Sequence, residues 1–307
     1  MKHMSDSLKK TNYALLHWKR LAWTTFRDTF SWLFVTVTLI GSLIAFLPEE
    51  EVAWLQKTIQ FLSQHIWVLV LLLLAVIAIA VLVNWPHTRA AYKDKTSDIW
   101  VIVESCDLLK QKGTKVIHMV DTFDTELGRI ISPKSLHGAF LQQCKDKQVP
   151  IDDLLNAQLA HLQPVKEDPS LPGKTNRYTL GTVCPVDIED ERYCCVAFTR
   201  LQPNGTIEIS KSDYIRCLKA MWRNLADPRI RGEELNVAVM GNRFVDLPAE
   251  FSTEQKIDLM IQTFFAVARE KACCRVLRIC VHPNNIAEID FAHYPIIMEH
   301  LAKRPVI

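Results

Sequence analysis

The sequence predicts an α/β protein in two parts: an N-terminal transmembrane helical hairpin, followed by a three-layer α/β/α sandwich with a mixed sheet. Two long apolar runs predict the hairpin, because a helix of about 20 uncharged residues crosses the hydrocarbon core of a membrane. After residue 98, strand-like and helix-like segments alternate over the rest of the 307 residues. Such alternation is typical of a sheet that is covered by helices on both faces.

The hairpin is expected over residues 30–85. Its two runs are Phe30–Leu47 and Ile66–Trp85, and neither contains a charged residue. Tryptophans at or near the run ends suit the interface between lipid and water. They are Trp32, Trp54, Trp67 and Trp85. The alternative is a buried helical hairpin of a soluble domain, but such helices rarely run this far without a strong polar group.

The positions of lysine and arginine predict the orientation of the hairpin. A basic leader, residues 1–29, precedes the first run, and a basic linker, residues 86–97, follows the second. The connection between the runs holds Lys57 beside three glutamates. The positive-inside rule therefore puts both termini in the cytoplasm. The leader is either an interfacial helix on the inner leaflet or a solvated segment that only supplies charge.

All nine cysteines lie after the hairpin, in the predicted cytoplasmic part, where thiols stay reduced. The adjacent pairs Cys194–Cys195 and Cys273–Cys274 lack the C-x-x-C spacing of zinc and redox motifs. We interpret the cysteines as small buried hydrophobic residues.

The domain 98–307 is expected to contain strands at 99–105, 114–120, 178–186, 193–201, 235–241 and 275–283. Helices are expected at 133–144, 151–162, 211–225 and 253–270. Helix caps are expected at Ser132 and at either Ser252 or Thr253. The acidic turn 187–191 joins two of the strands, so residues 178–201 are predicted to form a hairpin.

Polar groups follow four of the predicted strands, in the segments 106–108, 121–138, 197–199 and 240–244. Ligands of open α/β sheets bind at the carboxyl ends of the strands. The sequence therefore predicts a ligand pocket built from these four segments.

Individual side chains of this pocket allow more than one interpretation. Asp107 can accept a hydrogen bond from the exocyclic amine of an adenine, or it can cap a turn. Asp121 and Asp124 can form a general acid/base pair, or they can stabilise a turn. His137 can be a ligand or a base, or it can be structural. The sequence alone leaves these alternatives open.

Two loops can form cradles for phosphate. Ser135–Gly138 opens a helix, and backbone N–H groups at a helix N-terminus bind anions. Gly138 would allow close approach of a ligand. Gly241–Arg243 follows a strand, and the guanidinium of Arg243 can bind a phosphate with two N–H groups.

Several common functions are disfavoured. The sequence has no Walker A, dinucleotide-binding, zinc-protease or nucleophile-elbow motif. The part after the hairpin has nearly balanced charges, so it lacks the basic surface of a nucleic-acid-binding protein.

Three short motifs behind the hairpin resemble a known family. FDT (123–125), SLHG (135–138) and AFT (197–199), together with the strand–turn around Glu104–Leu109 and the VAVMGNR segment, occur in this order. The chain thereby resembles the membrane-bound effectors of Thoeris anti-phage defence, which carry two transmembrane helices and a divergent macro domain. The fold that this resemblance implies for residues 98–307 is macro-like.

The resemblance also implies a function. A partner TIR-domain enzyme would make an ADP-ribose-derived signal of the histidine–ADP-ribose class, and the macro domain would bind it. The effector would then assemble as a homo-oligomer in the bacterial inner membrane and disrupt the lipid, which leads to abortive infection. No catalysis, cofactor, metal or nucleic acid is implied.

By the same resemblance, Asp107 would lie at the adenine end, and the phosphate loops would be 121–138 and 241–244. The ligand-binding residues are expected to be Asp107, Leu108, Asp121, Phe123, Asp124, Thr125, Ser135, Leu136, His137, Gly138, Phe198, Thr199, Gly241, Asn242, Arg243 and Phe244.

The chain departs from ordinary macro domains at three places, one of which is the glycine-rich second loop, reduced here to Gly241–Arg243. Cys106 replaces the glycine before the adenine-end aspartate, and Val120–Thr122 replaces an asparagine-rich strand end used by ADP-ribosyl hydrolases. A membrane-tethered ADP-ribosyl hydrolase is the alternative function, and a scaffold without a small ligand is a third. Turnover of ADP-ribose conjugates distinguishes the first two.

Overall fold

The computed structural model describes residues 18–44, 60, 66–83, 85, 87–241 and 251–303. The chain forms two compact units, Met1–His87 and Thr88–Ile307. Most of the predicted leader lies outside the described residues.

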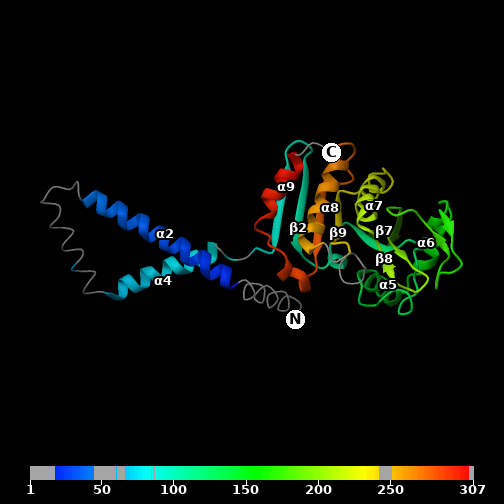
Figure 1. Ribbon diagram of the computed structural model, residues 1–307, viewed down its shortest axis with the longest axis horizontal. Helices are drawn as coiled ribbons and strands as arrows, with labels where there is room; N and C mark the ends of the chain where they lie inside the picture. Colours follow the sequence, from blue (N-terminus) through cyan, green and yellow to red (C-terminus); the bar gives the residue numbers. More distant parts are fainter. Residues whose placement is uncertain are drawn as a thin grey trace. The chain divides into compact units, whose positions relative to one another are not determined.

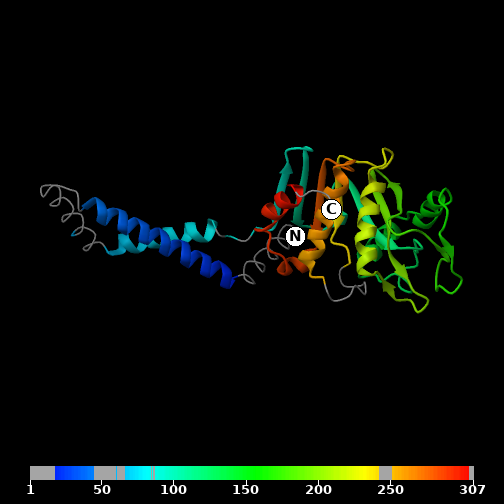
Figure 2. The same ribbon diagram turned by 45° about the horizontal axis from the view of Figure 1, so that its top comes forward.

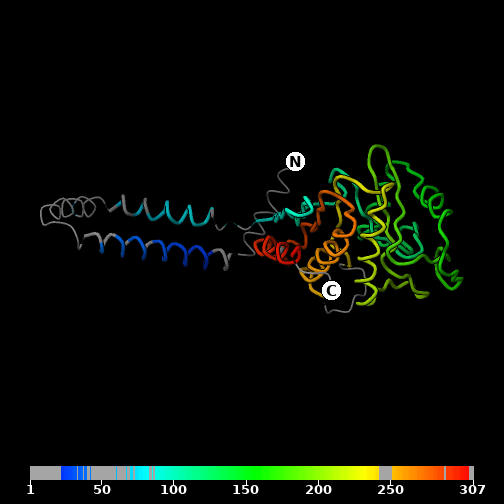
Figure 3. The backbone as a smooth tube through the Cα atoms, turned by 90° about the horizontal axis from the view of Figure 1, so that it is seen from above, coloured from blue at the N-terminus to red at the C-terminus, as the bar shows by residue number. Residues whose placement is uncertain are grey.

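The described residues of the first unit form the helices α2 (Trp18–Ile44) and α4 (Ile66–Val83), which contact each other (Figure 3). Large apolar side chains of both helices are exposed, among them Trp32 and Leu82. Among the described residues, no helix combines the length and the hydropathy required to cross a membrane. This observation therefore does not support the predicted transmembrane hairpin.

The second unit is built on an eight-stranded mixed sheet with the order β1-β2-β10-β9-β3-β7-β6, and β8 pairs with β7. Five strands at its centre run parallel: β2, β10, β9, β3 and β7. The edge strands β1 and β6 are antiparallel to their neighbours. The strands are β1 (Arg89–Asp94), β2 (Ile99–Ser105), β3 (Thr114–Val120), β6 (Val183–Ile188), β7 (Glu191–Leu201), β8 (Ile207–Glu208), β9 (Glu234–Ala238) and β10 (Val276–Val281).

Helices cover both faces of this sheet (Figures 1 and 2). On one face α7 (Lys211–Leu225), α8 (Thr253–Ala268) and α9 (Tyr294–Lys303) pack in sequence against one another. On the other face α5 (Leu136–Asp146) packs on β3, and α6 (Ile151–Leu159) packs on β6. Two short helices, η1 (Leu108–Lys110) and η2 (Pro283–Glu288), follow β2 and β10, and a small second sheet pairs β4 (Lys166–Glu167) with β5 (Asn176–Arg177). The predicted three-layer α/β/α sandwich is therefore observed.

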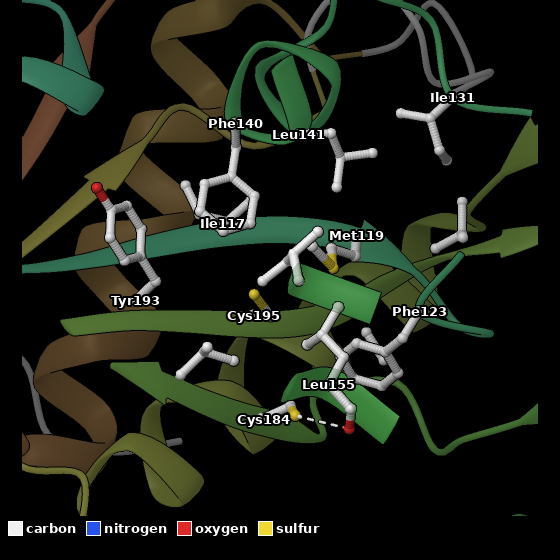
Figure 4. Packing of buried hydrophobic residues seen from close by; sticks show 14 of the residues in the cluster. Ile117, Met119, Phe123, Ile131, Phe140, Leu141, Leu155, Cys184, Tyr193 and Cys195 are labelled. Carbon is white, nitrogen blue, oxygen red and sulfur yellow. Dashed lines mark hydrogen bonds between the residues drawn. The ribbon is translucent and has the colours of Figure 1, made fainter. Parts of the chain in front are cut away.

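The core under α5 and α6 is apolar (Figure 4). Ile117 and Met119 of β3 and Cys195 of β7 meet Phe140 of α5 and Leu155 of α6, and all five are nearly inaccessible to solvent. Eight of the nine cysteines are buried and all nine are free thiols, as a role in packing requires. Burial raises the pKa of the Cys144 thiol to about 11, so this side chain is a neutral hydrophobic residue.

The observed elements differ from the prediction at several boundaries. The predicted linker, residues 86–97, contains β1, so half of it is part of the sheet. The strand predicted at 178–186 begins at Val183, and α9 and η2 were not predicted. The first of the two predicted caps is shifted, because Ser135 rather than Ser132 caps α5. Of the two residues predicted as the cap of α8, Ser252 is the one that caps it, through a capping box with Gln255.

Candidate functional site

A pocket of about 430 Å³ lies at the carboxyl ends of the parallel strands. Each of the five contributes a lining residue: Cys106 directly after β2, Cys280 of β10, Ala238 of β9, Met119 of β3 and Thr199 of β7. Because parallel strands end at the same edge of a sheet, the fold itself brings these five residues together. The predicted location of the pocket agrees with this arrangement.

The pocket lies where two central strands separate. β3 and β9 are hydrogen-bonded only from Thr114 to Val116, and the register of β3 against β7 shifts between Met119 and Val120. Beyond Val116, His118, Met119 and Val120 of β3 line the pocket, as do Ala238 and Val239 on the β9 side. The local divergence of the strands thus provides the space for a ligand.

The N-terminus of α5 forms one wall. Lys134, Ser135, Leu136 and His137 all line the pocket. The Ser135 hydroxyl accepts a hydrogen bond from Gly138 N–H at 2.9 Å, which fixes the first turn. The N–H groups at the start of a helix lack partners within the helix and carry a partial positive charge. This wall therefore suits an anionic group such as a phosphate.

Gly138 has a steric reason to be glycine. A Cβ atom at this position would overlap the backbone carbonyl of Ser132. Gly138 does not line the pocket. It permits the tight turn that places Ser135 and Leu136 at the wall, so its role is indirect.

Asp107 and Leu108 also line the pocket, and they follow β2 in the chain. The Asp107 carboxylate accepts a hydrogen bond from Leu109 N–H at 3.2 Å and forms an ion pair with Lys110. Asp107 is therefore the cap of η1 that the sequence allowed, and it also lines the pocket. One-third of its side chain remains exposed, so a ligand can reach the carboxylate.

Asp121 was predicted to contact the ligand but does not line the pocket. It is fully buried, and its carboxylate accepts hydrogen bonds from Arg177 at 2.7 Å and from Leu201 N–H at 3.0 Å. Arg177 also donates to Asp168 at 3.1 Å and to the carbonyl of Leu201 at 2.6 Å. Asp121 therefore anchors the β4–β5 segment to the end of β7.

The FDT motif also lies outside the pocket lining. Phe123 is fully buried against Tyr178, with ring centroids 5.6 Å apart. Asp124 accepts a hydrogen bond from Lys174 N–H at 2.8 Å, and Thr125 donates to Asp152 at 2.5 Å. All three side chains are thus engaged in holding the loop 121–138 in place. This arrangement favours the structural alternative over an acid/base pair.

Of the remaining residues that were predicted to bind the ligand, some line the pocket and others do not. Thr199 lines the pocket, whereas Phe198 is fully buried between His118 and Tyr214. Gly241 does not line the pocket, and its carbonyl accepts a hydrogen bond from Lys256 at 2.9 Å. Asn242, Arg243 and Phe244 lie outside the described residues.

Sequence reasoning missed part of the lining. His118, Lys134 and Cys280 belong to the pocket, and so do His282, Asn284 and Asn285 after β10. The polar segment 282–285 directly follows a strand, so the strand-end argument could have found it. His118 gave no such signal, because it lies inside an apolar strand and is reached only where β3 and β9 separate.

Two of the histidines that line the pocket, His118 and His137, have lowered pKa values. Burial lowers the pKa of His118 to about 4. Burial, together with the nearby His118, lowers the pKa of His137 to about 3, although a hydrogen bond to the backbone of Asp124 opposes this shift. The Nδ1 atom of His118 and the Nε2 atom of His137 are buried without a hydrogen-bond partner. Within the described ranges, no cluster of three or more His, Cys, Asp or Glu residues is arranged to hold a metal ion.

Comparison with known proteins identifies one protein family whose model matches this chain. The family model described as Thoeris protein ThsA, Macro domain, matches residues 101–282. A search of curated proteins gives no match. The similar solved structures include the Oceanobacillus iheyensis macrodomain with MES bound, which is 12% identical with a TM-score of 0.42 and covers 69% of this chain and 97% of that chain.

Two further structures of the Oceanobacillus iheyensis macrodomain give similar values. The structure with ADP is 11% identical with a TM-score of 0.39 and covers 68% of this chain and 98% of that chain. A mutant is 12% identical with a TM-score of 0.41 and covers 70% of this chain and 95% of that chain. Because these TM-scores are below 0.5, the family assignment rests on the family model.

Proposed function

The chain belongs to the family of the Thoeris protein ThsA macro domain, and from this membership we propose that it acts in anti-phage defence by binding an ADP-ribose-derived signal. The observation that carries the proposal is the pocket at the strand ends, with the N-terminus of α5 in its wall. A volume of about 430 Å³ falls in the range of small-molecule sites. The α5 wall suits the diphosphate of such a ligand.

We further propose that the signal is of the histidine–ADP-ribose class and is made by a partner TIR-domain enzyme. Binding would drive homo-oligomerisation and membrane disruption, since two helices per chain are too few to enclose a pore. By linkage, the signal must bind the assembled state more tightly than the single chain. The effector would reside in the bacterial inner membrane with both termini in the cytoplasm.

The features of α2 and α4 that support a membrane role are their exposed apolar side chains and, in the second half of α2, hydroxyl groups that bond within the helix. In α2, the hydroxyl groups of Thr36, Thr38 and Ser42 each donate to the carbonyl four residues earlier, at 2.7–2.8 Å. A hydroxyl bonded in this way needs no water. The residues of α4 carry no charge.

We propose that the protein is not an enzyme. Asp121 and Asp124, the carboxylates that acid/base catalysis would use, are both engaged in hydrogen bonds outside the pocket lining. The test is to incubate the purified chain with ADP-ribose conjugates in a detergent micelle, while calorimetry measures binding and chromatography measures products. Binding without turnover supports a signal receptor, turnover supports the hydrolase, and no binding supports a scaffold.

Replacing Asp107 with Ala is expected to weaken the binding of ADP-ribose by about 1–3 kcal/mol, because a charge-assisted hydrogen bond at the pocket is lost. Calorimetric titration measures this difference. The matched control is Asp227→Ala, because Asp227 caps a turn through Arg229 N–H at 2.9 Å but lies outside the pocket lining. Equal affinities for Asp107→Ala and Asp227→Ala would rule out a contact between Asp107 and the ligand.

Deleting residues 30–85 is expected to leave a protein that binds ADP-ribose but is no longer toxic in cells that make the signal. The reason is that the apolar helices are removed, while the unit from Thr88 onward keeps its own sheet and pocket. Growth curves after phage infection measure the toxicity. Toxicity that persists in the deletion variant would refute the membrane mechanism.

A further inference from the structure

Two cysteines lie at the ends of neighbouring strands and line the same cavity. Cys280 belongs to β10, and Cys106 directly follows β2. In the register of these parallel strands Cys280 stands opposite Glu104, and the Cys106 N–H still donates to the carbonyl of Val281 at 3.0 Å. Because side chains alternate along a strand, Cys106 and Glu104 lie on the same face of the sheet. The two cysteines are therefore diagonal neighbours on one face.

The thiols of Cys106 and Cys280 form a hydrogen bond with each other. This hydrogen bond and burial raise the pKa of the Cys280 thiol well above its usual range. Cys280 therefore keeps its proton and donates it toward the Cys106 sulfur. The guanidinium of Arg278, two residues before Cys280, interacts electrostatically with both sulfur atoms, although its partner Glu104 opposes this effect. A sulfur atom beside a donor and a cation is suited to react as a thiolate.

The two thiols differ in access. Of the nine cysteines, Cys106 alone is not fully buried, whereas Cys280 is only 2% exposed. A reagent that enters the cavity therefore meets the Cys106 sulfur first. Cys280 lies behind it as a thiol that can react with whatever forms on Cys106.

The other neighbouring cysteines do not share this access. Cys184 and Cys195 stand opposite each other on β6 and β7, but both are fully buried in the core. Cys273 and Cys274 have sulfur atoms 4.0 Å apart, and they too are buried. None of these four residues lines the pocket. Among the close cysteine pairs, the one formed by Cys106 and Cys280 is thus set apart by its contact with the cavity.

We propose that Cys106 and Cys280 form a reversible disulfide, through which a peroxide switches the pocket between an open and a closed state. In the first step the Cys106 sulfur attacks the peroxide, the O–O bond breaks, and a sulfenic acid and one water molecule form. In the second step the Cys280 sulfur attacks the sulfenic acid, the S–S bond forms, the S–O bond breaks and a second water leaves. The two thiols lose two electrons and two protons, and these reduce the peroxide. A dithiol reductant reverses the reaction by exchange.

The disulfide would change the pocket through the residue that follows Cys106. A covalent bond draws the two sulfur atoms closer together than a hydrogen bond does. Asp107, the next residue, is the cap of η1, and both Asp107 and Leu108 line the cavity. Oxidation therefore displaces this part of the wall and weakens ligand binding. Formation of the disulfide goes beyond the proposed function, and only its effect on ADP-ribose rests on that function.

The first test is to titrate the full chain, reduced and held in a detergent micelle, with hydrogen peroxide. Free thiols are counted after denaturation, and peptides from an unreduced digest are identified by mass spectrometry. We expect each peroxide to remove two thiols, with a peptide that contains Cys106 linked to one that contains Cys280, and dithiothreitol to restore both. This measurement needs no variant, so the absence of that linked peptide overturns the proposal by itself.

Variants assign the order of the two steps. In Cys280→Ser the sulfenic acid on Cys106 has no thiol to react with, so it should be trapped by dimedone, whereas Cys106→Ser should give neither adduct nor disulfide. The matched control is Cys195→Ala, which removes the cross-strand pair of the core and should still lose two thiols per peroxide. An equally strong dimedone adduct in the unaltered chain and in Cys280→Ser would contradict the role of Cys280.

A calorimetric titration then measures the effect on the pocket. The affinity for ADP-ribose should fall at least about 10-fold on oxidation, which corresponds to about 1.4 kcal/mol, and should recover after reduction. Peroxide should not change the affinity of Cys106→Ser relative to the same variant before treatment. A disulfide that leaves the affinity unaltered would refute the switch. If the reduced chain does not bind ADP-ribose, the proposed function fails, while the thiol count still decides whether the disulfide forms.

Discussion

Replacing Arg177 with Ala is expected to lower the free energy of unfolding by about 3–5 kcal/mol, the usual cost of leaving a buried charge without its partner. Asp121 is fully buried, and Arg177 is largely so, at a separation of 2.7 Å. The guanidinium also bonds Asp168 and the carbonyl of Leu201. Removal of the side chain would leave the Asp121 carboxylate buried without its charged partner. Its remaining hydrogen-bond partner would be the N–H group of Leu201.

The matched control is Arg192→Ala. Arg192 forms a two-pronged contact with Asp187 at 2.7 and 2.9 Å, so the geometry is comparable, but both side chains are exposed. Exposed pairs contribute about 0–1 kcal/mol. Urea denaturation of both variants measures the difference. If Arg177→Ala were no more destabilised than Arg192→Ala, the Asp121–Arg177 pair would not be the anchor described here.

Acidification from pH 7 to pH 5 is expected to destabilise the fold through His137 and His118. In the unfolded chain a histidine binds a proton below a pKa of about 6.5. In the folded chain the pKa is about 3 for His137 and about 4 for His118. Between these values the unfolded state binds more protons, so stability is complete above pH 6.5 and is lost as the pH falls.

The size of this effect follows from the two pKa values. At pH 5 the loss is about 2 kcal/mol for His137, and it is smaller for His118 because that ring borders the pocket. Burial raises the pKa of the half-buried Asp258 to about 6, which opposes the loss, since its folded form takes up a proton in the same range. Solvent around Asp258 keeps this opposing contribution small.

The measurement is the free energy of unfolding between pH 7 and pH 5, for the unaltered chain and for a His118→Phe, His137→Leu double variant. The double variant should show a much weaker dependence on pH, since it removes the groups that take up protons on unfolding. An identical dependence in both proteins would show that these histidines are not the source of acid lability.

The sequence predicted the part of the fold that depends on local pattern. Strand β3 and helix α7 have the predicted bounds, because β-branched runs and amphipathic spacing mark them clearly. Strand β1 was not predicted, because Arg89–Asp94 is a polar edge strand that resembles a linker in composition. Helix α9 is rich in apolar residues but was also missed, because it is short and carries Pro295 at its second position, directly after a turn.

The sequence predicted where the candidate site lies better than it predicted which side chains line it. The ends of parallel strands must meet, so the pocket could be placed from the strand pattern alone. Which side chains enter it depends on distant partners that the sequence does not mark. Asp121 lies outside the lining because Arg177, 56 residues further along the chain, holds it. His118 lies inside it because β3 separates from β9.

Cys106 differs from the other eight cysteines because it alone is not fully buried, and it borders the pocket beside Asp107. The native chain therefore carries a single thiol that is suited to covalent labelling with a fluorophore. Since a label at this position would sit at the rim of the binding cavity, its emission would report occupancy directly, without engineered mutations. Such a sensor would allow unidentified metabolites in extracts of infected cells to be screened.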